Sequence, residues 1–171
     1  MKTFYTVDRR GIYTQQQQFE LIKPNIKPDE LQTIAQKFFN QGYSPQGDAY
    51  FLSGQAIATD RSVMIDFSLE LYRRAFYPDK PSRYTSIFAC TNIEDADKFR
   101  KGYSTSNAQI YEINCQEGEF HIGDMSLLTN DATNLTYAYL LEQYWAGTTT
   151  SQNPFWEVLI PLPVTIGKSV N

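Results

Sequence analysis

Residues 82–90 read Ser-Arg-Tyr-Thr-Ser-Ile-Phe-Ala-Cys, a run that turns from polar to apolar. Such a run predicts a buried strand that is entered from a polar, proline-marked loop. The preceding segment, Ser62–Tyr77, carries apolar residues at helical spacing and predicts a helix. The following residues, Thr91-Asn-Ile-Glu94, form a capping box that predicts a short helix through Arg100.

Further segments on both sides of this stretch predict strands and helices in irregular alternation. Two helices are predicted over Asp29–Gln41 and over Asp131–Trp145, the second closed by Gly147. The last predicted strand segment is a strand pair or one strand broken by Pro161 and Pro163, which belong at an edge or a bulge. The predicted strand segments are Thr3–Asp8, Phe19–Ile22, Tyr50–Leu52, Ala108–Cys115, Phe120–Met125 and Trp156–Ile166. Because no regular βαβ rhythm is present, we expect an α+β fold with an antiparallel sheet.

The composition sets limits on the class of protein. The chain has 171 residues, of which 15% are aromatic and 20% charged, and its formal net charge is −4. We therefore expect one folded domain over residues 1–171. The acidic balance argues against a protein that binds mainly nucleic-acid phosphates. No apolar run has the length of a signal peptide core or a membrane span, which predicts a cytoplasmic protein without a membrane partner.

Ligands for a metal ion are scarce in this sequence. His121 is the single histidine, and Cys90 and Cys115 lie in separate apolar runs. A zinc site needs several closely spaced ligands of these types. We therefore expect two buried thiols and no metal site.

Basic and hydroxyl side chains gather at the ends of two predicted strands. Arg9 and Arg10 follow the first strand, where they are either solvated or form an anion site, since guanidinium groups bind phosphate in a bidentate manner. Lys80 and Arg83 add positive charge before the strand that contains Ser86. Taken alone, this second segment is more simply explained as a strand start with ordinary turn chemistry.

Glu157 stands between Trp156 and a run of three aliphatic residues. A carboxylate in such surroundings is costly unless it is paired or used. One interpretation is an exposed position on an edge strand. The other is a carboxylate that binds sugar hydroxyls or stabilises an oxocarbenium-like centre.

Taken in chain order, Arg9 or Arg10, Ser86 and Glu157 resemble the Arg…Ser…Glu constellation of the ADP-ribosyltransferase superfamily. Over nearly its full length the chain also resembles a bacterial domain family of unknown function. The stretches that carry this resemblance are FYTVDRRG (4–11), YRRAFYPDKPSRYTSIFA (72–89), IEDADKFR (93–100), GDMSLLT (123–129), and YWAG (144–147) followed by NPFWEVLIP (153–161).

The resemblance implies a fold of split antiparallel β-sheets with flanking helices and an NAD cleft. Arg9 or Arg10 would hold a phosphate and ribose of NAD. Ser86 would support both the nicotinamide ribose and Glu157, and Glu157 would bind the ribose 2′-hydroxyl and favour the oxocarbenium ion. Tyr84 and Thr85 would complete the motif at the start of this strand. The candidates for stacking on nicotinamide are Tyr5, Tyr84 and Trp145.

The implied function is a mono-ADP-ribosyltransferase with NAD as co-substrate and a macromolecular acceptor. The net charge favours a protein acceptor over a nucleic acid, and Phe155 stands where arginine-modifying members carry Glu or Gln. Related proteins act as toxins, effectors or phage-defence proteins, in their own cytoplasm or in a target cell, and a cognate antitoxin or chaperone would fit such a role. Thr6 stands where related toxins carry an arginine. This difference leaves open the alternative of a catalytically inactive module that binds a nucleotide or a partner. NAD hydrolysis is a further alternative.

Overall fold

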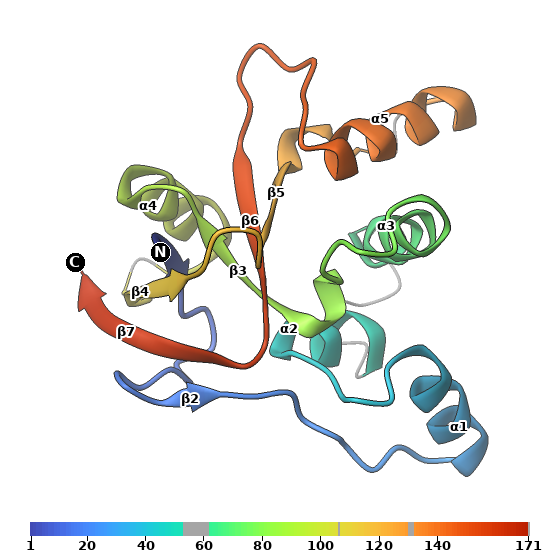
Figure 1. Ribbon diagram of the computed structural model, residues 1–171, viewed down its shortest axis with the longest axis horizontal. Helices are drawn as coiled ribbons and strands as arrows, with labels where there is room; N and C mark the ends of the chain where they lie inside the picture. Colours follow the sequence, from blue (N-terminus) through green and yellow to red (C-terminus); the bar gives the residue numbers. More distant parts are fainter. Residues whose placement is uncertain (53–61, 106, 130–131, 171) are drawn as a thin grey trace.

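The computed structural model describes residues 1–52, 62–105, 107–129 and 132–170. Within these residues, seven strands form one antiparallel sheet in the order β2-β7-β4-β1-β3-β6-β5 (Figure 1). The strands are β1 (Lys2–Val7), β2 (Gln18–Phe19), β3 (Ser86–Cys90), β4 (Ile110–Cys115), β5 (His121–Asp124), β6 (Trp156–Pro161) and β7 (Val164–Val170). The predicted α+β class with an antiparallel sheet is confirmed.

Helices and single turns cover this sheet. The α-helices are α1 (Asp29–Phe38), α2 (Pro45–Gly47), α3 (Ser62–Phe76), α4 (Ile93–Tyr103) and α5 (Asn134–Ala146). The turns are the π-helical η1 (Asp48–Leu52) and the 3-10 turns η2 (Arg83–Thr85) and η3 (Met125–Leu127). Helix α4 packs against both β1 and β3, while α5 packs against β5 and α3 (Figure 1).

The sheet has a weak seam in its middle. Strands β1 and β3 are in register through one residue pair, Tyr5 with Cys90, whereas β1 and β4 are paired over all six residues of β1. Beyond that pair, the Thr6 hydroxyl donates to the Phe88 carbonyl at 2.6 Å. The seam divides the sheet into a β2-β7-β4-β1 half and a β3-β6-β5 half.

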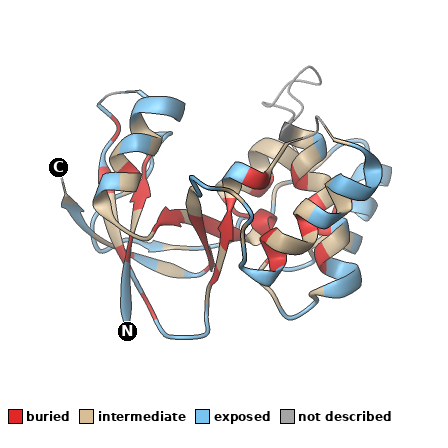
Figure 2. Ribbon diagram, turned by 90° about the horizontal axis from the view of Figure 1, so that it is seen from above, coloured by how far each residue is buried: buried red, intermediate tan, exposed pale blue. Residues whose placement is uncertain are grey.

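Alternate residues of β6 enter different apolar cores, because neighbouring side chains of a strand point to opposite faces. Val158 and Ile160 pack with Phe4 and other residues of the sheet. Leu159 packs with residues of α3 and α5, among them Leu69 and Trp145. Figure 2 shows buried residues on the strands in the middle of the molecule and on parts of the neighbouring helices. Strand β6 is therefore held from both faces.

Two predicted strand segments adopt turns. The prediction of a strand at Tyr50–Leu52 is wrong, because these residues belong to the π-helical turn η1. Ser44 starts this helical region by accepting a hydrogen bond from the Gly47 amide, and Pro45 occupies the first helical position, which suits its fixed φ. The predicted strand at 82–90 begins only at Ser86, because the Ser82 side chain caps a 3-10 turn.

Proline and cap positions also differ from the predictions. Trp156–Ile166 is a strand pair, and its first strand, β6, lies between β3 and β5 rather than at an edge. Pro161 is tolerated there as the last residue of β6. The N-cap of α4 is Asn92, whose side chain accepts from the Asp95 amide at 2.8 Å. The predicted capping box was therefore displaced by one residue.

The other predicted segments are present with shifted limits. Helix α1 ends at Phe38 rather than Gln41. Helix α5 starts at Asn134 with Thr133 as its N-cap; the predicted start at Asp131 lies outside the described residues. Gly147 closes α5 at a φ of 72°, a left-handed conformation that glycine adopts without strain.

The candidates for redox or metal chemistry are buried in the cores. Cys90 and Cys115 are buried free thiols, as predicted. His121 stacks on Trp145, and burial lowers the pKa of His121 to about 4, so the ring is neutral at pH 7. No described helix combines the length and the apolar character that crossing a membrane requires.

Candidate functional site

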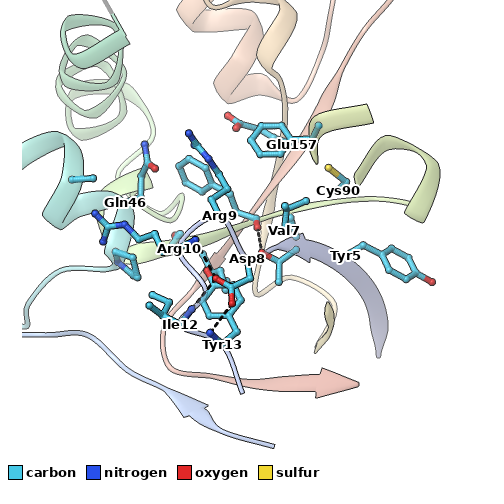
Figure 3. Close-up of a pocket in the computed structure, with 18 of the residues that line it drawn as sticks. Tyr5, Val7, Asp8, Arg9, Arg10, Ile12, Tyr13, Gln46, Cys90 and Glu157 are labelled. Atoms are coloured by element: carbon cyan, nitrogen blue, oxygen red, sulfur yellow. Dashed lines mark hydrogen bonds between the residues drawn. The ribbon is translucent and has the colours of Figure 1, made fainter. Parts of the chain in front are cut away.

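A pocket of about 360 Å³ lies at the seam between β1 and β3 (Figure 3). Its volume is in the range of small-molecule sites. The walls come from β1 and the loop after it, from α2 and η1, from β3, and from the start of β6, with single residues of α4 and η3. The candidate residues that line it are Tyr5, Arg9, Arg10, Ser86 and Glu157. The structure therefore brings one part of the predicted site together.

Asp8 shapes the loop that carries the two arginines. This buried carboxylate accepts hydrogen bonds from the backbone amides of Ile12 at 3.1 Å and Tyr13 at 2.8 Å. The chain therefore folds back tightly around Asp8, and both arginines stand at the outer turn. Sequence reasoning noted Asp8 only as a polar residue at the strand end.

The two arginines differ in their partners. Arg10 extends toward Gln46, and its Nη1 atom lies 3.6 Å from Asp48 Oδ2 (Figure 3). Arg9 extends toward the side of the pocket where Glu157 lies. The guanidinium carbon of Arg9 lies 5.8 Å from the centre of the Phe99 ring, and the described residues give Arg9 no carboxylate partner. Arg9 is thus the better-placed cation for an anionic ligand.

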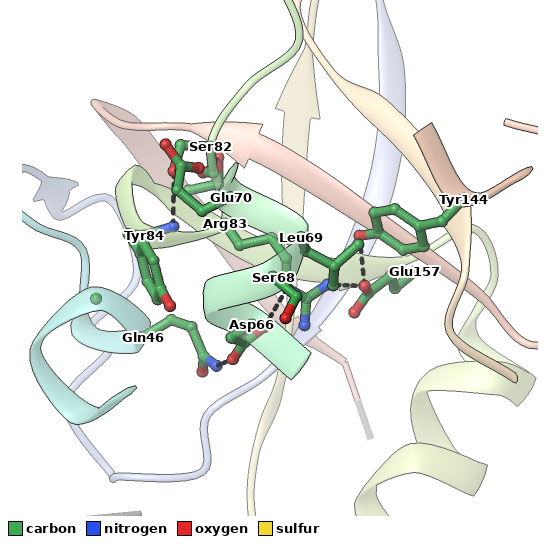
Figure 4. Close-up of polar contacts among 12 residues, drawn as sticks. Gln46, Asp66, Ser68, Leu69, Glu70, Ser82, Arg83, Tyr84, Tyr144 and Glu157 are labelled. Carbon is green, nitrogen blue, oxygen red and sulfur yellow. Dashed lines mark hydrogen bonds and ion pairs between the residues drawn. The ribbon is translucent and has the colours of Figure 1, made fainter. Parts of the chain in front are cut away.

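Glu157 is buried on an interior strand, which excludes the interpretation as an exposed edge position. Its Oε1 atom accepts hydrogen bonds from the Tyr144 hydroxyl at 2.6 Å and from the Arg83 guanidinium (Figure 4). Arg83 also donates to Tyr144 Oη at 2.8 Å, so the three groups form a closed triangle.

The second oxygen of Glu157 is left for the pocket. Both donors contact Oε1, and no described group donates to Oε2. Among the described residues, only the Tyr84 hydroxyl is a buried polar side-chain atom without a hydrogen-bond partner. Oε2 is therefore accessible, on a side chain whose orientation is fixed by two donors on the other oxygen.

The Arg83 guanidinium is shared between two carboxylates. It pairs with Asp66 of α3 as well as with Glu157, and Asp66 is held in turn by the Gln46 amide at 3.1 Å (Figure 4). Burial alone would lower the pKa of Arg83, but the two carboxylates keep it well above its ordinary value. One cation against two carboxylates leaves the buried cluster with an excess negative charge, which favours a cationic group in the pocket.

Ser86 does not meet Glu157. In the β3–β6 pairing, Glu157 stands opposite Cys90, whereas Ser86 stands opposite Pro161. The two positions are therefore about 13 Å apart along the strands. The Ser86 hydroxyl donates to the Ser82 carbonyl at 2.7 Å. The predicted support of Glu157 by Ser86 is replaced by support from Arg83 and Tyr144.

Other predicted site residues lie away from the pocket. Tyr84 and Trp145 are completely buried in two apolar cores, and the Trp145 indole donates to the Leu69 carbonyl at 3.1 Å. Thr85 lines a separate surface hollow near Arg73 and Arg74. The structure therefore leaves Tyr5 as the pocket-lining member of the three aromatic candidates.

The 78–82 loop before Arg83 is held by a buried cluster of polar residues around Glu70. Glu70, fully buried on α3, accepts from Arg73 at 2.9 and 3.0 Å, from Arg74 at 2.6 Å and from the Ser82 hydroxyl at 2.7 Å. Arg73 also donates to the carbonyls of Pro78 and Lys80. These bonds fasten the 78–82 loop to α3, which places Arg83 at the pocket wall.

Sequence reasoning missed Asp66 and Tyr144. Asp66 and Glu70 are one helical turn apart, on the face of α3 that also carries Leu69. This spacing could have indicated the cluster from the sequence, because acidic residues on an apolar helix face need buried partners. Tyr144 offered no such signal, since a tyrosine in an apolar helix is ordinary core.

Asp124 positions the chain just before Glu157. Its carboxylate accepts from the amides of Phe155 at 2.8 Å and Ser126 at 2.9 Å, and from the Thr149 hydroxyl. Burial raises the pKa of Asp124, but these donors outweigh it and lower the pKa overall. Met125 and Phe155, both pocket-lining, are thereby held at the rim.

Gly123 leaves room for the Tyr144 ring. A Cβ atom at this position would lie 2.5–2.8 Å from ring atoms of Tyr144. We expect Gly123→Ala to destabilise the protein by about 1–3 kcal/mol, because the ring must move away from Glu157. Urea unfolding measures this change. Gly102→Ala is the matched control, since a Cβ there meets nothing within 4 Å inside α4, and it should stabilise by about 0.5–1 kcal/mol. Equal effects of the two substitutions would contradict this account.

Comparison with known proteins gives one family. A search of curated proteins finds no match. A family model described as "Protein of unknown function (DUF2441)" matches residues 3–171. This span includes every residue that lines the pocket, and the chain therefore belongs to the DUF2441 family of proteins of unknown function.

Proposed function

We propose that the protein is an NAD-dependent ADP-ribosyltransferase that acts in the pocket at the sheet seam. One observation carries the proposal: the pocket combines Arg9, an arginine to which the described residues give no carboxylate partner, with Glu157, a buried carboxylate whose Oε2 atom is open. A dinucleotide with a cationic nicotinamide ring presents complementary groups to both.

The fold is compatible with this proposal. The superfamily named above has two small antiparallel sheets with the NAD cleft between them. Here the sheet halves meet through the single pair Tyr5–Cys90, and the pocket lies at that meeting point. This likeness of sheet and pocket supports an ADP-ribosyltransferase-like fold.

Arg9 would bind a phosphate group of NAD. Its guanidinium stands at the end of β1 and offers bidentate donors for phosphate oxygens. The Phe99 ring beneath it limits the positions that the side chain takes. Arg10 would act as a second cation at the opposite side of the mouth, next to Asp48.

Glu157 would stabilise the positive charge that develops on the ribose. The bond between ribose C1′ and the nicotinamide nitrogen breaks, its electron pair stays on that nitrogen, and neutral nicotinamide leaves. The acceptor's lone pair then forms the new bond to C1′, and the acceptor's proton passes to solvent. Oε2 of Glu157 supplies a preorganised negative charge beside the cationic centre, and Arg83 and Tyr144 prevent its rotation.

Calorimetric titration with NAD tests the binding part. We expect Arg9→Gln to weaken NAD binding by about 10- to 100-fold, the loss of one charge-assisted pair of hydrogen bonds. Lys80→Gln is the control, because Lys80 does not line the pocket, and it should leave affinity unchanged. A larger loss in Arg10→Gln than in Arg9→Gln would reverse the assignment of the two arginines.

Nicotinamide release separates the functional alternatives. Release with label transferred from NAD to a macromolecule supports the transferase. Release with free ADP-ribose alone would identify an NAD glycohydrolase instead. NAD binding without release would point to a silent binding module, and no binding of NAD at millimolar concentration would refute the proposal.

A further inference from the structure

Three aromatic rings form a nearly parallel series at the rim of the pocket, here called the ring platform: Phe155, Phe99 and Tyr103. The ring centres of Phe99 and Tyr103 are 5.1 Å apart with an interplanar angle of 29°, and those of Phe99 and Phe155 are 6.5 Å apart at 21°. Phe99 and Phe155 line the pocket. Tyr103, one helical turn further along α4, is 59% exposed.

The ring platform is held in place from below. Phe99 packs against the buried cluster formed by Val7 and its neighbours under α4. The amide of Phe155 donates to Asp124 at 2.8 Å, and its carbonyl accepts from the Met125 amide at 2.9 Å. Phe99 and Phe155 are therefore positioned before any ligand arrives, which lowers the entropic cost of stacking.

The ring platform connects the donor site to solvent. Its inner end is Phe155, two residues before Glu157, and the Arg9 guanidinium lies over the middle ring, Phe99. Its outer end is the exposed Tyr103. An acceptor that stacks along it would reach the ribose next to Glu157 from the open side of the pocket.

We propose that the ring platform binds an unpaired base of single-stranded nucleic acid, and that this base is the acceptor of ADP-ribose. The inference rests on the proposed transferase function and narrows its acceptor class. Aromatic side chains stack on bases irrespective of sequence, because every base has a π-face. The Arg9 guanidinium over Phe99 is assigned to the NAD phosphate, so the acceptor strand is held chiefly by stacking.

The covalent step leaves atoms and charges balanced. The nitrogen of an exocyclic amino group of the base donates its lone pair to ribose C1′ as nicotinamide leaves with the electron pair of the broken bond. The proton on that nitrogen then passes to water. The products are neutral nicotinamide, the ADP-ribosylated base and one proton.

The net charge of the protein determines how strongly the binding of a single strand depends on salt. The chain has a net charge of −4, so stacking rather than an extensive phosphate contact has to hold the strand. We expect affinity for a single strand to fall with salt with a shallow slope, typical of one or two phosphate contacts. Duplex nucleic acid should bind much more weakly, because its bases are already stacked.

Fluorescence anisotropy with labelled 12-nucleotide single strands of mixed sequence, one RNA and one DNA, tests the site. We expect Tyr103→Ser to weaken binding by about 5- to 100-fold, the loss of one base-stacking contact. Tyr139→Ser on α5 is the matched control, since Tyr139 is 48% exposed and does not line the pocket. Equal effects of the two substitutions, or equal binding of the duplex, would overturn the proposal.

Transfer from labelled NAD separates this proposal from the function on which it rests. With wild-type protein, we expect label on the RNA or the DNA strand, and the stronger of the two identifies the natural acceptor. Tyr103→Ser should lose this label while NAD binding stays unchanged. Label on proteins of a lysate, with none on either strand, refutes the base acceptor and leaves the transferase standing. Absence of nicotinamide release in every arm refutes the transferase itself.

Discussion

Glu157→Gln is expected to lower the rate of nicotinamide release by about 100- to 1000-fold at saturating NAD, the effect typical of removing one preorganised charge-stabilising group. The amide keeps the size of the side chain, and its oxygen still accepts from Arg83 and Tyr144, so the pocket keeps its shape. What is lost is the negative charge at Oε2. The measurement is nicotinamide release under multiple-turnover conditions, with NAD affinity determined separately.

Glu112→Gln provides the matched control for this experiment. Glu112 is also a strand glutamate with a cationic partner, Lys168 at 3.4 Å, but it does not line the pocket. Its substitution should leave the rate unchanged. Tyr144→Phe removes one of the two donors on Glu157 Oε1 and should give an intermediate loss without a change in NAD affinity. A rate for Glu157→Gln equal to wild type would contradict the role of Glu157.

Much of the fold could be predicted from the sequence, because local patterns decide local elements. The apolar runs around Ile87, Ile113 and Val158 predicted strands that are indeed central. The prediction of a strand at Tyr50–Leu52 is wrong, because these apolar residues fit a strand as well as a helical turn over so short a run. The cap at Ser44 is the local signal that decides between the two.

Of the candidate site, only the two charged residues Arg9 and Glu157 could be predicted from the sequence. Arg9 and Glu157 stood out because each is a charged residue attached to a predicted strand. Strand register, however, depends on pairing across the sheet, and a sequence does not reveal that Cys90 rather than Ser86 lies opposite Glu157. Arg83 was predicted only to add positive charge before the strand that contains Ser86, whereas the cluster around Glu70 turns it inward between two carboxylates.

Arg83→Met is expected to destabilise the protein by about 3–5 kcal/mol, because Asp66 and Glu157 would both be left buried without their cation. Methionine fills most of the volume of the arginine side chain, so the loss reflects charge rather than a cavity. Urea unfolding measures it. Lys98→Met is the control, since the Lys98–Asp95 pair is at the surface, and its loss should leave the urea midpoint nearly unchanged.

A triple variant distinguishes lost pairing from lost packing. In Asp66→Asn, Arg83→Met, Glu157→Gln the buried charges disappear together, and replacing a buried ionic cluster by neutral groups is often neutral for stability. We expect this variant to recover most of the stability that Arg83→Met loses, and to release no nicotinamide. A triple variant as unstable as Arg83→Met would show that Arg83 acts through packing. Recovery of stability would mean that the fold does not need the charges of this cluster, which leaves the orientation of Glu157 toward the pocket as their role.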